Sequence, residues 1–436
     1  MRVSFYTLGC KVNIYESESL AAELQQHGYD VVAWPGEADI YVINGCAVTA
    51  RAAAKSRQVA NRVRRLHPQA RLVQMGCYVT AEPDEAQGIG ADLVLDNTRK
   101  PRLRFYLQHM LENSDSAMPL PHEEHAGFAE YAGFAPLQHS RPFIKIQDGC
   151  NNRCSFCLIP DLRGPERSRA MDAILQEAQR YTDLGYRELI LTGIHLSRWG
   201  SDMQPPLRLV DLLRALLKDK DCPRVRLSST EPTDIDDELI DFYVAHASRL
   251  CLHLHIPLQS GSDATLQRMG RRYRTDEYRN LLQKLRALLP GISVSTDVIV
   301  GFPGETAQEF DQTYAFCQEM NFSRMHIFRY SKRAGTPAAD MPMQVEPQVQ
   351  EERSAKLHAL AETMARAYAA TFLGEEVEVL LEQKPAEQEM ASGYSSHYLQ
   401  GNISWSKEIP ATGMIHRFIV QRVEGDRLYA AKEDKE

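Results

Sequence analysis

The sequence predicts a three-part α/β protein, with an N-terminal doubly wound parallel sheet, a central partial (βα)6 barrel and a small C-terminal β-barrel. Three observations predict this architecture. Short apolar runs alternate with helical stretches in the first part, six strand-then-helix units follow, and short strands broken by Gly and Pro end the chain. We place these domains at 1–119, 141–371 and 372–436, with an irregular linker at 120–140.

The N-terminal part alternates between the two element types. Helices are expected near 16–27 and 48–66, and short buried strands at 3–7, 31–33, 39–43, 72–75 and 93–95. Such alternation is typical of a parallel sheet with helices on both faces.

Three of these strands end in Gly-Cys, which places Cys10, Cys46 and Cys77 at equivalent positions. The carboxyl ends of parallel strands face the same way, so these cysteines can converge although they are far apart in sequence. Two interpretations stay open. The cysteines hold an iron–sulfur cluster with one open iron, or they are three small buried core residues.

The central part repeats a strand and a helix six times. Strands are expected at 143–147, 188–192, 224–229, 251–256, 292–300 and 325–330. Six units are too few to close an eight-stranded barrel, so we expect a partial barrel with its function on the loops after the strands.

The first of these loops carries Cys150, Cys154 and Cys157 within eight residues. Three thiolates cannot all pair as disulfides, and they leave one position of a four-coordinate structural zinc site unfilled. They can hold three irons of a 4Fe-4S cluster and leave the fourth iron open for a ligand. A zinc site that borrows a distant fourth ligand is the alternative.

Composition narrows the class of protein. A formal charge of −8 argues against a generally basic nucleic-acid binder, although local basic patches remain compatible with it. We find no leader and no apolar run near the roughly 18 residues that a membrane helix needs, so we expect a cytoplasmic protein with no membrane partner. Its nine cysteines are then reduced, as metal ligands or core residues.

Two basic groups stand out, as solvated surface or as contacts for RNA phosphates. One lies on the predicted helix at 48–66 and comprises Arg51, Lys55, Arg57, Arg62, Arg64 and Arg65. The other follows the fourth barrel strand and comprises Arg268, Arg271, Arg272 and Arg274.

The last part changes character after a long predicted helix at 348–368. Strands are expected at 377–381, 398–403 and 415–420, which suits a small β-barrel.

Several strings along nearly the whole chain, in order, resemble the methylthiotransferase family of radical S-adenosylmethionine (SAM) enzymes. They are Thr7-Leu8-Gly9-Cys10-Lys11-Val12-Asn13, 148–157, Arg163-Gly164 with Ser168-Arg169, 255–262 and 297–306. In addition, 393–398 resembles the middle of the TRAM domain, an RNA-binding barrel often found at this end of the family, with a purely structural barrel as the alternative.

The resemblance implies two 4Fe-4S clusters and SAM as cofactors. It implies that Cys150, Cys154 and Cys157 hold the cluster that reduces SAM, and that Cys10, Cys46 and Cys77 hold an auxiliary cluster that carries the incoming sulfur. The implied reaction places a methylthio group on an aromatic carbon. It requires a radical, because no side-chain base of ordinary pKa removes hydrogen from an unactivated aromatic carbon. The implied partners are the anticodon loop of tRNA, a reductase and an unidentified sulfur donor.

By the same resemblance, a further set of residues meets SAM, with a turn or core role as the alternative for each. The set is Phe156, Thr192, Gly193, Ser229, Glu231, Gln259 and Gly301. His253 and His255 lie on one face of a predicted strand, and we interpret them as packing inside the barrel, with a metal site as the alternative. Cys222, Cys251 and Cys317 lack ligand spacing and are expected to be structural.

The substrate is suggested by resemblance alone. The string at 7–13 looks most like the branch that adds a methylthio group to C2 of N6-threonylcarbamoyladenosine next to the anticodon. The alternatives are the branch that modifies isopentenyladenosine in tRNA and the branch that modifies a ribosomal-protein aspartate. A non-enzymatic iron–sulfur protein that binds RNA or senses redox state is the rival from another class.

Overall fold

The computed structural model describes residues 1–112, 127–131, 133, 139–383, 390–404 and 412–431. The predicted linker at 120–140 therefore lies largely outside the described residues. The chain forms two compact units: the first comprises 1–137, 147–169 and 331–336, and the second comprises 138–146, 170–330 and 337–436. Among the described helices, none is both long and apolar enough to span a bilayer. The predicted domain boundaries stay a prediction.

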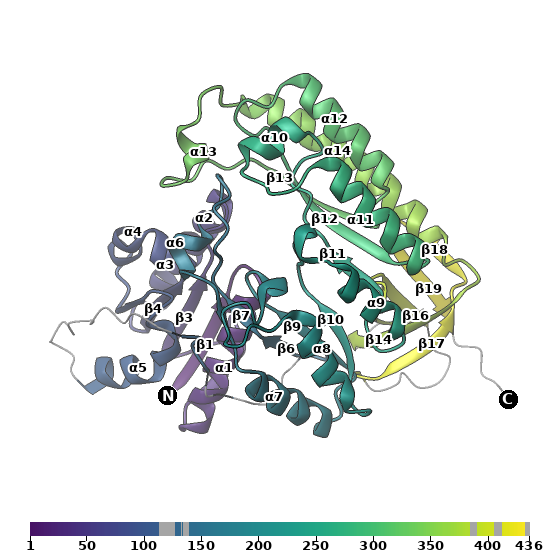
Figure 1. Cartoon of the computed structure of the whole chain (residues 1–436). Coiled ribbons are helices and arrows are strands. Elements are labelled where there is room, and N and C mark those ends of the chain that lie inside the picture. The colour runs from purple at the N-terminus through teal and green to yellow at the C-terminus, as the bar shows by residue number, and fades with distance from the viewer. Residues whose placement is uncertain (113–126, 132, 134–138, 384–389, 405–411, 432–436) are drawn as a thin grey trace. The chain divides into compact units, whose positions relative to one another are not determined.

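The first unit contains a five-stranded parallel sheet in the order β2-β1-β3-β4-β5 (Figure 1). Its strands are β1 (Arg2–Thr7), β2 (Asp30–Val32), β3 (Ile40–Gly45), β4 (Arg71–Gly76) and β5 (Leu93–Leu95). This order confirms the doubly wound sheet. The strand order runs from β1 to β2 on one side and from β1 to β3, β4 and β5 on the other, so it reverses at β1. In sheets of this kind, ligands bind beyond the carboxyl ends of the strands near that reversal.

Two helices cover opposite faces of this sheet. Helix α2 (Ala50–Leu66) packs Val59 and Val63 onto the face that includes Tyr41. Helix α1 (Lys11–Gln26) covers the other face, where Ser17 accepts hydrogen bonds from Thr7 and Asn44. The predicted start of α1 was wrong by five residues, because Cys10 is the extended residue before the helix and the motif at 11–13 forms its first turn.

Shorter elements complete the first unit. They are α3 (Cys77–Ala81), α4 (Pro83–Gly88), η1 (Lys100–Arg102), α5 (Leu103–Glu112), β7 (Gln147–Asp148), α6 (Ile159–Arg163) and β8 (Arg167–Ser168). Strands β7 and β8 pair antiparallel and flank the second cysteine segment.

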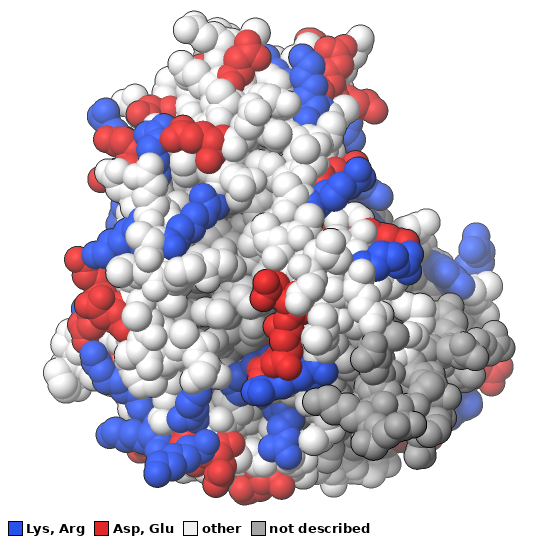
Figure 2. All heavy atoms as spheres, turned by 90° about the vertical axis from the view of Figure 1, so that its right-hand side faces the viewer, with Lys and Arg blue, Asp and Glu red and all other residues white. Residues whose placement is uncertain are grey.

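Charge is mixed on one face of the molecule. On the face shown in Figure 2, Lys and Arg side chains lie among Asp and Glu side chains. This mixture is compatible with the formal charge of −8.

The second unit contains the partial barrel. Parallel strands β6 (Phe143–Lys145), β9 (Glu188–Thr192) and β10 (Arg224–Leu227) form one sheet, and β11 (His253–His255), β12 (Ser293–Val300) and β13 (Arg324–Arg329) form another. Parallel bridges Val225–Leu250 and Ser229–His255 join β10 to β11. The six strands therefore follow one another as predicted.

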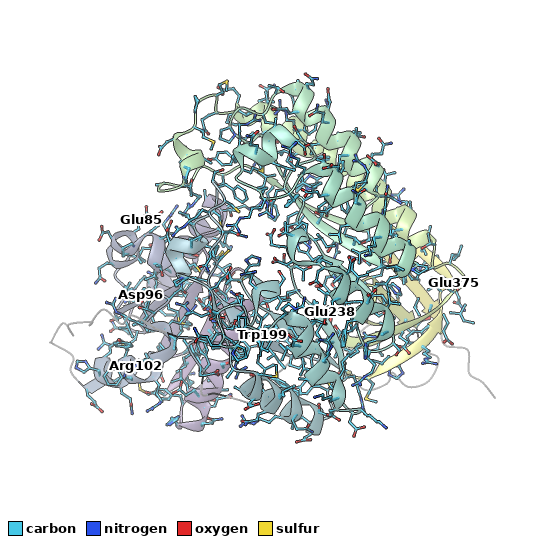
Figure 3. The ribbon with its side chains drawn as sticks, in the orientation of Figure 1. Glu85, Asp96, Arg102, Trp199, Glu238 and Glu375 are labelled. Carbon is cyan, nitrogen blue, oxygen red and sulfur yellow. The ribbon has the colours of Figure 1, made fainter. Side chains whose placement is uncertain are left out.

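Helices follow the strands of the partial barrel. Among the described residues, the largest fully buried side chain is that of Trp199 (labelled in Figure 3). The helices are α7 (Met171–Asp183), η2 (Leu196–Arg198), α8 (Leu209–Lys218), η3 (Pro232–Asp234), α9 (Asp237–Ala245), α10 (Asp263–Arg268), α11 (Thr275–Leu288), α12 (Ala307–Met320), α13 (Pro337–Asp340) and α14 (Pro347–Ala370). The three remaining cysteines, Cys222, Cys251 and Cys317, are buried, as expected for structural residues.

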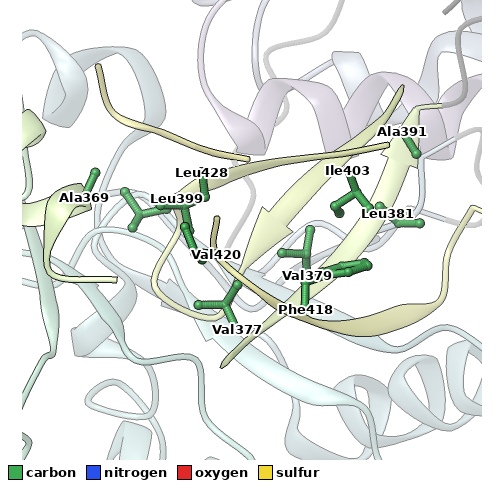
Figure 4. Close-up of a cluster of buried hydrophobic side chains, with 10 residues drawn as sticks. All are labelled: Ala369, Val377, Val379, Leu381, Ala391, Leu399, Ile403, Phe418, Val420 and Leu428. Atoms are coloured by element: carbon green, nitrogen blue, oxygen red, sulfur yellow. The ribbon is translucent and has the colours of Figure 1, made fainter. Parts of the chain in front are cut away.

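The C-terminal part is a six-stranded mixed sheet that curves into a half-barrel. The strands are β14 (Glu376–Gln383), β15 (Met390–Ser395), β16 (Gln400–Ser404), β17 (Ile415–Ile419), β18 (Arg422–Glu424) and β19 (Arg427–Ala431), in the order β17-β14-β15-β16-β19-β18. Val377, Leu381 and Phe418 contribute to its core (Figure 4).

Strand β15 was not predicted because it contains Gly393 and small polar residues, which are poor strand formers. The structure requires this glycine, since a Cβ there would lie 1.8 Å from the carbonyl oxygen of Leu380 on the neighbouring strand. The short strands β18 and β19 were also missed.

A buried carboxylate fastens the half-barrel to the barrel. Glu188, at the start of β9, is fully buried, and its oxygens lie 2.6 Å from Arg226 Nε and 2.7 Å from Arg224 Nε. The same guanidinium groups donate to the half-barrel: Arg226 to the carbonyl of Ser395 at 2.8 Å, and Arg224 to that of Tyr394 at 3.3 Å. The TRAM-like string at 393–398 therefore serves as a packing contact.

Arg141 adds a third cation to this group. It donates to Glu188 at 3.5 Å and to Glu382 of β14 at 2.7 Å, and its guanidinium lies 4.6 Å from the ring centroid of Tyr394. Burial raises the pKa of Glu188, but the charges of Arg226 and Arg224 outweigh burial and hold this pKa well below its usual range.

Replacing Glu188→Gln is expected to lower the free energy of unfolding by about 3–5 kcal/mol, because the buried arginines lose their counter-charge. Since the carboxylate pKa is depressed in the folded state, its contribution is present above about pH 4.3 and declines as the pH falls. Urea titrations of both proteins across this pH range measure the difference. The control Arg417→Ala, at an exposed pair with Glu378, is expected to change nothing, and equal stability of all three proteins would contradict the role of Glu188.

Candidate functional site

The three Gly-Cys pairs lie at the carboxyl edge of the parallel sheet of the first unit. Cys10 lies three residues beyond the end of β1, just before α1, Cys46 directly follows β3, and Cys77 begins α3 at the end of β4. Both Gly9 and Gly76 have positive φ, +104° and +93°, a conformation that favours glycine. Each glycine also leaves room for its neighbours: a Cβ on Gly9 would lie 3.1 Å from the sulfur of Cys46.

The thiols of this trio interact with one another. Burial raises the pKa of Cys46 to about 11, the N–H of Val48 opposes that rise, and negative charge on Cys77 and Cys10 adds to it. Such mutual repulsion disfavours three free thiolates, and a bound cation relieves it. Asn97 Nδ2 donates to the sulfur of Cys77 at 3.4 Å, which suits a sulfur that carries negative charge.

The second cysteine segment belongs to the same unit. It runs from β7 to α6 and folds back on itself: the N–H of Cys150 donates to the carbonyl of Gly164 at 3.1 Å, and that of Cys157 to the carbonyl of Cys154 at 3.0 Å. The N–H of Asn152 donates to the sulfur of Cys150 at 3.4 Å. Backbone donors to sulfur are a regular feature of cluster-binding loops.

One buried arginine joins the two cysteine regions. Arg163 ends α6, just beyond the second cysteine segment, and its side chain is 1% exposed. It donates to Asp148 of β7 at 3.0 Å, to Glu16 of α1 at 3.0 Å and to the side chain of Asn13 at 2.6 Å. The residues before and after the second cysteine trio are thereby held against the helix that begins after Cys10.

A second buried cation completes the charge balance. Lys100 is fully buried and donates to Glu16 and, at 3.0 Å, to Asn97, the residue that also contacts Cys77. Burial opposes the charge of Arg163, yet the charges of Glu16 and Asp148 raise its pKa well above the usual value, so the guanidinium stays charged. Its charge in turn favours the thiolate of Cys46.

The donor sets fit iron–sulfur clusters better than single metal ions. A zinc ion with Zn–S bonds of about 2.3 Å needs sulfurs roughly 3.8 Å apart. Within the part of the chain that the structure describes, the groups of ligand atoms that all lie within 4.8 Å of one another include neither cysteine trio. Three thiols spread around a larger space, with glycines and N–H donors behind them, suit a 4Fe-4S cluster with one open iron.

The predicted SAM-binding residues of the second unit lie at the carboxyl ends of neighbouring strands. Thr192 is the last residue of β9, Ser229 pairs with His255 beyond β10, and Gln259 pairs with Val298 beside β12. Gln259 and Gly301 have positive φ, 65° and 69°, in tight turns. Gly193 directly follows β9. Phe156 lies between two cysteines in the first unit.

Several of these residues already have partners. Glu231 is paired with Arg271, and Arg268 is paired with Glu309 at 2.8 Å. Two of the four arginines in the basic group after the fourth barrel strand, Arg268 and Arg271, are therefore already paired with carboxylates. The N–H of Gly301 donates to Glu305 at 3.0 Å, so this glycine closes a turn.

The structure adds a polar trio that sequence reasoning missed, formed by His255, Asp297 and His326. His255 Nε2 lies 3.3 Å from Asp297, its Nδ1 lies 3.0 Å from Ser295 Oγ, and the imidazole of His326 is exposed. Ligand atoms of the trio all lie within 4.8 Å of one another. His253, by contrast, is buried as expected, 2.8 Å from the same Ser295.

Comparison with known proteins identifies this arrangement. Residues 144–317 match the model of the Radical SAM superfamily, and residues 2–96 match that of Uncharacterized protein family UPF0004. A radical SAM methyltransferase from Kitasatospora setae, solved with cobalamin and a 4Fe-4S cluster, has a similar fold, with a TM-score of 0.58 and 16% identity over 78% of this chain and 77% of that chain. Fold and site therefore define a radical SAM enzyme.

Curated relatives narrow the class. The threonylcarbamoyladenosine tRNA methylthiotransferase MtaB of Bacillus subtilis is 39% identical over 91% of this chain and 89% of its own. The enzyme of the same name from Thermotoga maritima is 35% identical over 91% of this chain and 90% of its own. The chain belongs to the radical SAM tRNA methylthiotransferase family.

Replacing Arg163→Met is expected to reduce the iron and sulfide bound per chain after anaerobic reconstitution to less than half. The change leaves Glu16 and Asp148 buried without their shared cation, which costs about 3–5 kcal/mol. Arg163→Lys keeps the charge but not the planar fork and is expected to fall between. Arg153→Met changes an arginine of the same segment whose side chain is 76% exposed, and it should bind iron as the wild type does. Full cluster content in Arg163→Met would contradict the bridging role.

Proposed function

We propose that this protein transfers a methylthio group to C2 of N6-threonylcarbamoyladenosine next to the anticodon of tRNA. The observation that carries this function is the presence, in one unit, of two cysteine trios joined by a buried arginine network. The names of the relatives in Bacillus subtilis and Thermotoga maritima support the substrate. Because the substrate is a tRNA, the reaction belongs in the cytoplasm.

Cys150, Cys154 and Cys157 would hold the first cluster, and Cys10, Cys46 and Cys77 the second. When bound, the first cluster and one SAM would supply the radical that removes hydrogen from the adenine C2, the second cluster would supply the sulfur, and a second SAM would supply the methyl group. The chain's own contribution is positional. Arg163 and its carboxylates fix the loops of both trios, and the glycines at 9 and 76 allow the backbone to approach.

Seven residues are proposed to contact SAM. Thr192, Gly193, Ser229, Gln259 and Gly301 present backbone atoms at the ends of strands, where barrels of this kind bind ligands. Phe156 offers its ring beside the cysteines, and Glu231 offers a carboxylate that Arg271 already orients. A reductase that supplies electrons and a source of sulfur are the remaining partners of the proposed reaction.

The polar trio His255, Asp297 and His326 suits the threonyl part of the substrate. A threonylcarbamoyl group carries a carboxylate and a hydroxyl, whereas an isopentenyl group is apolar. His326 is exposed, and all three residues lie within three positions of the carboxyl ends of their strands. We assign the trio to recognition of this polar group.

The cysteine assignments are tested with the reconstituted enzyme, SAM and tRNA that carries threonylcarbamoyladenosine. Cys154→Ala should abolish formation of 5′-deoxyadenosine, because SAM loses its site on the first cluster. Cys46→Ala should retain SAM cleavage and lose the methylthio product. Chromatography and mass spectrometry measure both products, and a methylthio nucleoside from Cys46→Ala would contradict the role of the auxiliary trio.

Replacing His326→Ala is expected to lower the yield of methylthio nucleoside by about tenfold, since one hydrogen bond to a charged group is worth about 1.5–3 kcal/mol. SAM cleavage in the absence of tRNA should be unchanged. His358→Ala, at an exposed histidine of α14, is the matched control. Equal product from all three proteins would remove the trio from substrate recognition.

A further inference from the structure

A hollow of about 450 Å³ lies on the α2 face of the first unit and is distinct from the cysteine residues. Its walls combine two aromatic rings, Tyr6 and Trp34, with the side chains of Lys55, Arg62 and Arg65. The amides Gln58 and Asn61 also line it, and none of its lining residues is acidic. Aromatic rings, amides and cations together are the groups that bind single nucleotides of an RNA strand.

Six cations lie on α2: two are paired, three line the hollow, and Arg51 does neither among the described residues. Arg57 is paired with Glu85 of α4 at 2.8 Å (Glu85 is labelled in Figure 3), and Arg64 donates to Asp92 and to two backbone carbonyls. These arginines serve the fold, and neither lines the hollow.

The cations in the hollow differ. Lys55, Arg62 and Arg65 are exposed, and among the residues that the structure describes none of the three forms an ion pair. The paired arginines of the helix therefore contribute to packing, and three cations without an ion pair line one cavity. By contrast, charges are mixed on the face shown in Figure 2. Unpaired cations are the ones available to phosphate.

The aromatic side is firmly built. The rings of Tyr6 and Trp34 are 4.8 Å apart between centroids, and the ring of Tyr41 packs edge-to-face with Trp34 at 5.8 Å. Tyr6 and Trp34 are both half-buried, so each presents part of its ring to the cavity. A ring held in this way can stack on a base without first losing much conformational freedom.

The hollow extends from the same end of the sheet as the auxiliary cysteines. Tyr6 pairs in register with Ile43, three residues before Cys46. Lys55 lies about 8 Å along the axis of α2 from its start at Ala50, and Arg65 about 22 Å, at 1.5 Å per residue. Cations at these two positions along α2 can contact successive phosphates of an RNA strand that leaves the cysteine edge of the sheet.

We propose that this hollow binds a second nucleotide of the tRNA, outside the target adenosine, with its base against Trp34 and Tyr6 and its phosphates at Lys55, Arg62 and Arg65. The inference rests on the proposed function, because it presumes an RNA substrate. It adds a second point of attachment in the single-stranded loop, which fixes the direction of the strand at the cysteine edge.

The test measures binding of tRNA that carries threonylcarbamoyladenosine to the reconstituted full chain by fluorescence anisotropy at several salt concentrations. Arg62→Ala with Arg65→Ala is expected to weaken binding about tenfold and to reduce the slope of log Kd against log salt by about 1.4, for two phosphates of a single strand. Trp34→Leu is expected to weaken binding about fivefold with the slope unchanged. Ultraviolet cross-linking should attach RNA to the peptide that contains Trp34.

The matched control removes the same charge from another exposed helix, α14, with Lys356→Ala and Arg366→Ala. It should bind as the wild type does. Equal affinity and slope in the Arg62 and Arg65 double variant would overturn the inference, as would an equal loss in the control. Because Arg62 and Arg65 are exposed, replacing them is not expected to disturb the fold. For Trp34→Leu, the iron bound per chain shows whether the variant folds.

Two further outcomes separate the possible sources of failure. Binding of AMP is measured with the same proteins. If the Arg62 and Arg65 double variant loses AMP binding but keeps tRNA binding, the hollow is assigned to a free nucleotide, and the inference is overturned while the proposed function stays in place. Failure of the wild type to bind tRNA at all would overturn the proposed function as well.

Discussion

The buried group of Arg163, Glu16 and Asp148 is the interaction on which the cysteine region depends. Alone, each of these charges would be costly inside the protein, and together they remain only because two carboxylates and two cations, Lys100 included, face one another. Replacing such a group with apolar side chains often stabilises a protein, so its presence here is better explained by position than by stability. It fixes the strand before Cys150 and the helix after Cys10 to one guanidinium.

The fixed position of Arg163 accounts for how the two cysteine loops are held. If each cysteine trio holds a cluster, as proposed, its loop must keep the thiols apart before metal is bound, which thiol repulsion and short glycine turns alone do not ensure. Arg163 adds a fixed positive charge that favours the thiolate of Cys46. The half-barrel follows a similar principle at Glu188, where a buried carboxylate collects three arginines and aligns the C-terminal sheet with the barrel.

The sequence predicts the elements well where apolar periodicity is strong and the partners are local. The parallel sheet, the six barrel strands and the alignment of three Gly-Cys pairs followed from that pattern. It does not predict Arg163, Asn97 and Lys100 as a group, because the contacts that join them to α1 and α6 span 65 to 150 positions and a buried arginine looks like any other in the sequence. The backbone of 393–398 accepts hydrogen bonds from Arg226, RNA contact by this string stays a prediction, and Gly393 kept β15 from being predicted. Polar residues three to six positions after a cysteine, such as Asn13 after Cys10 and Arg163 after Cys157, are the signal that points to the network.

The most direct test of the account is mass spectrometry of tRNA nucleosides from cells that lack this gene, with the gene restored as a comparison. Loss of the 2-methylthio form of threonylcarbamoyladenosine on deletion, and its return with the wild-type gene but not with Cys46→Ala, is the predicted result. An unchanged amount of that nucleoside in the deletion strain would contradict the account, and a change confined to the methylthio-isopentenyl nucleoside would contradict the assigned substrate.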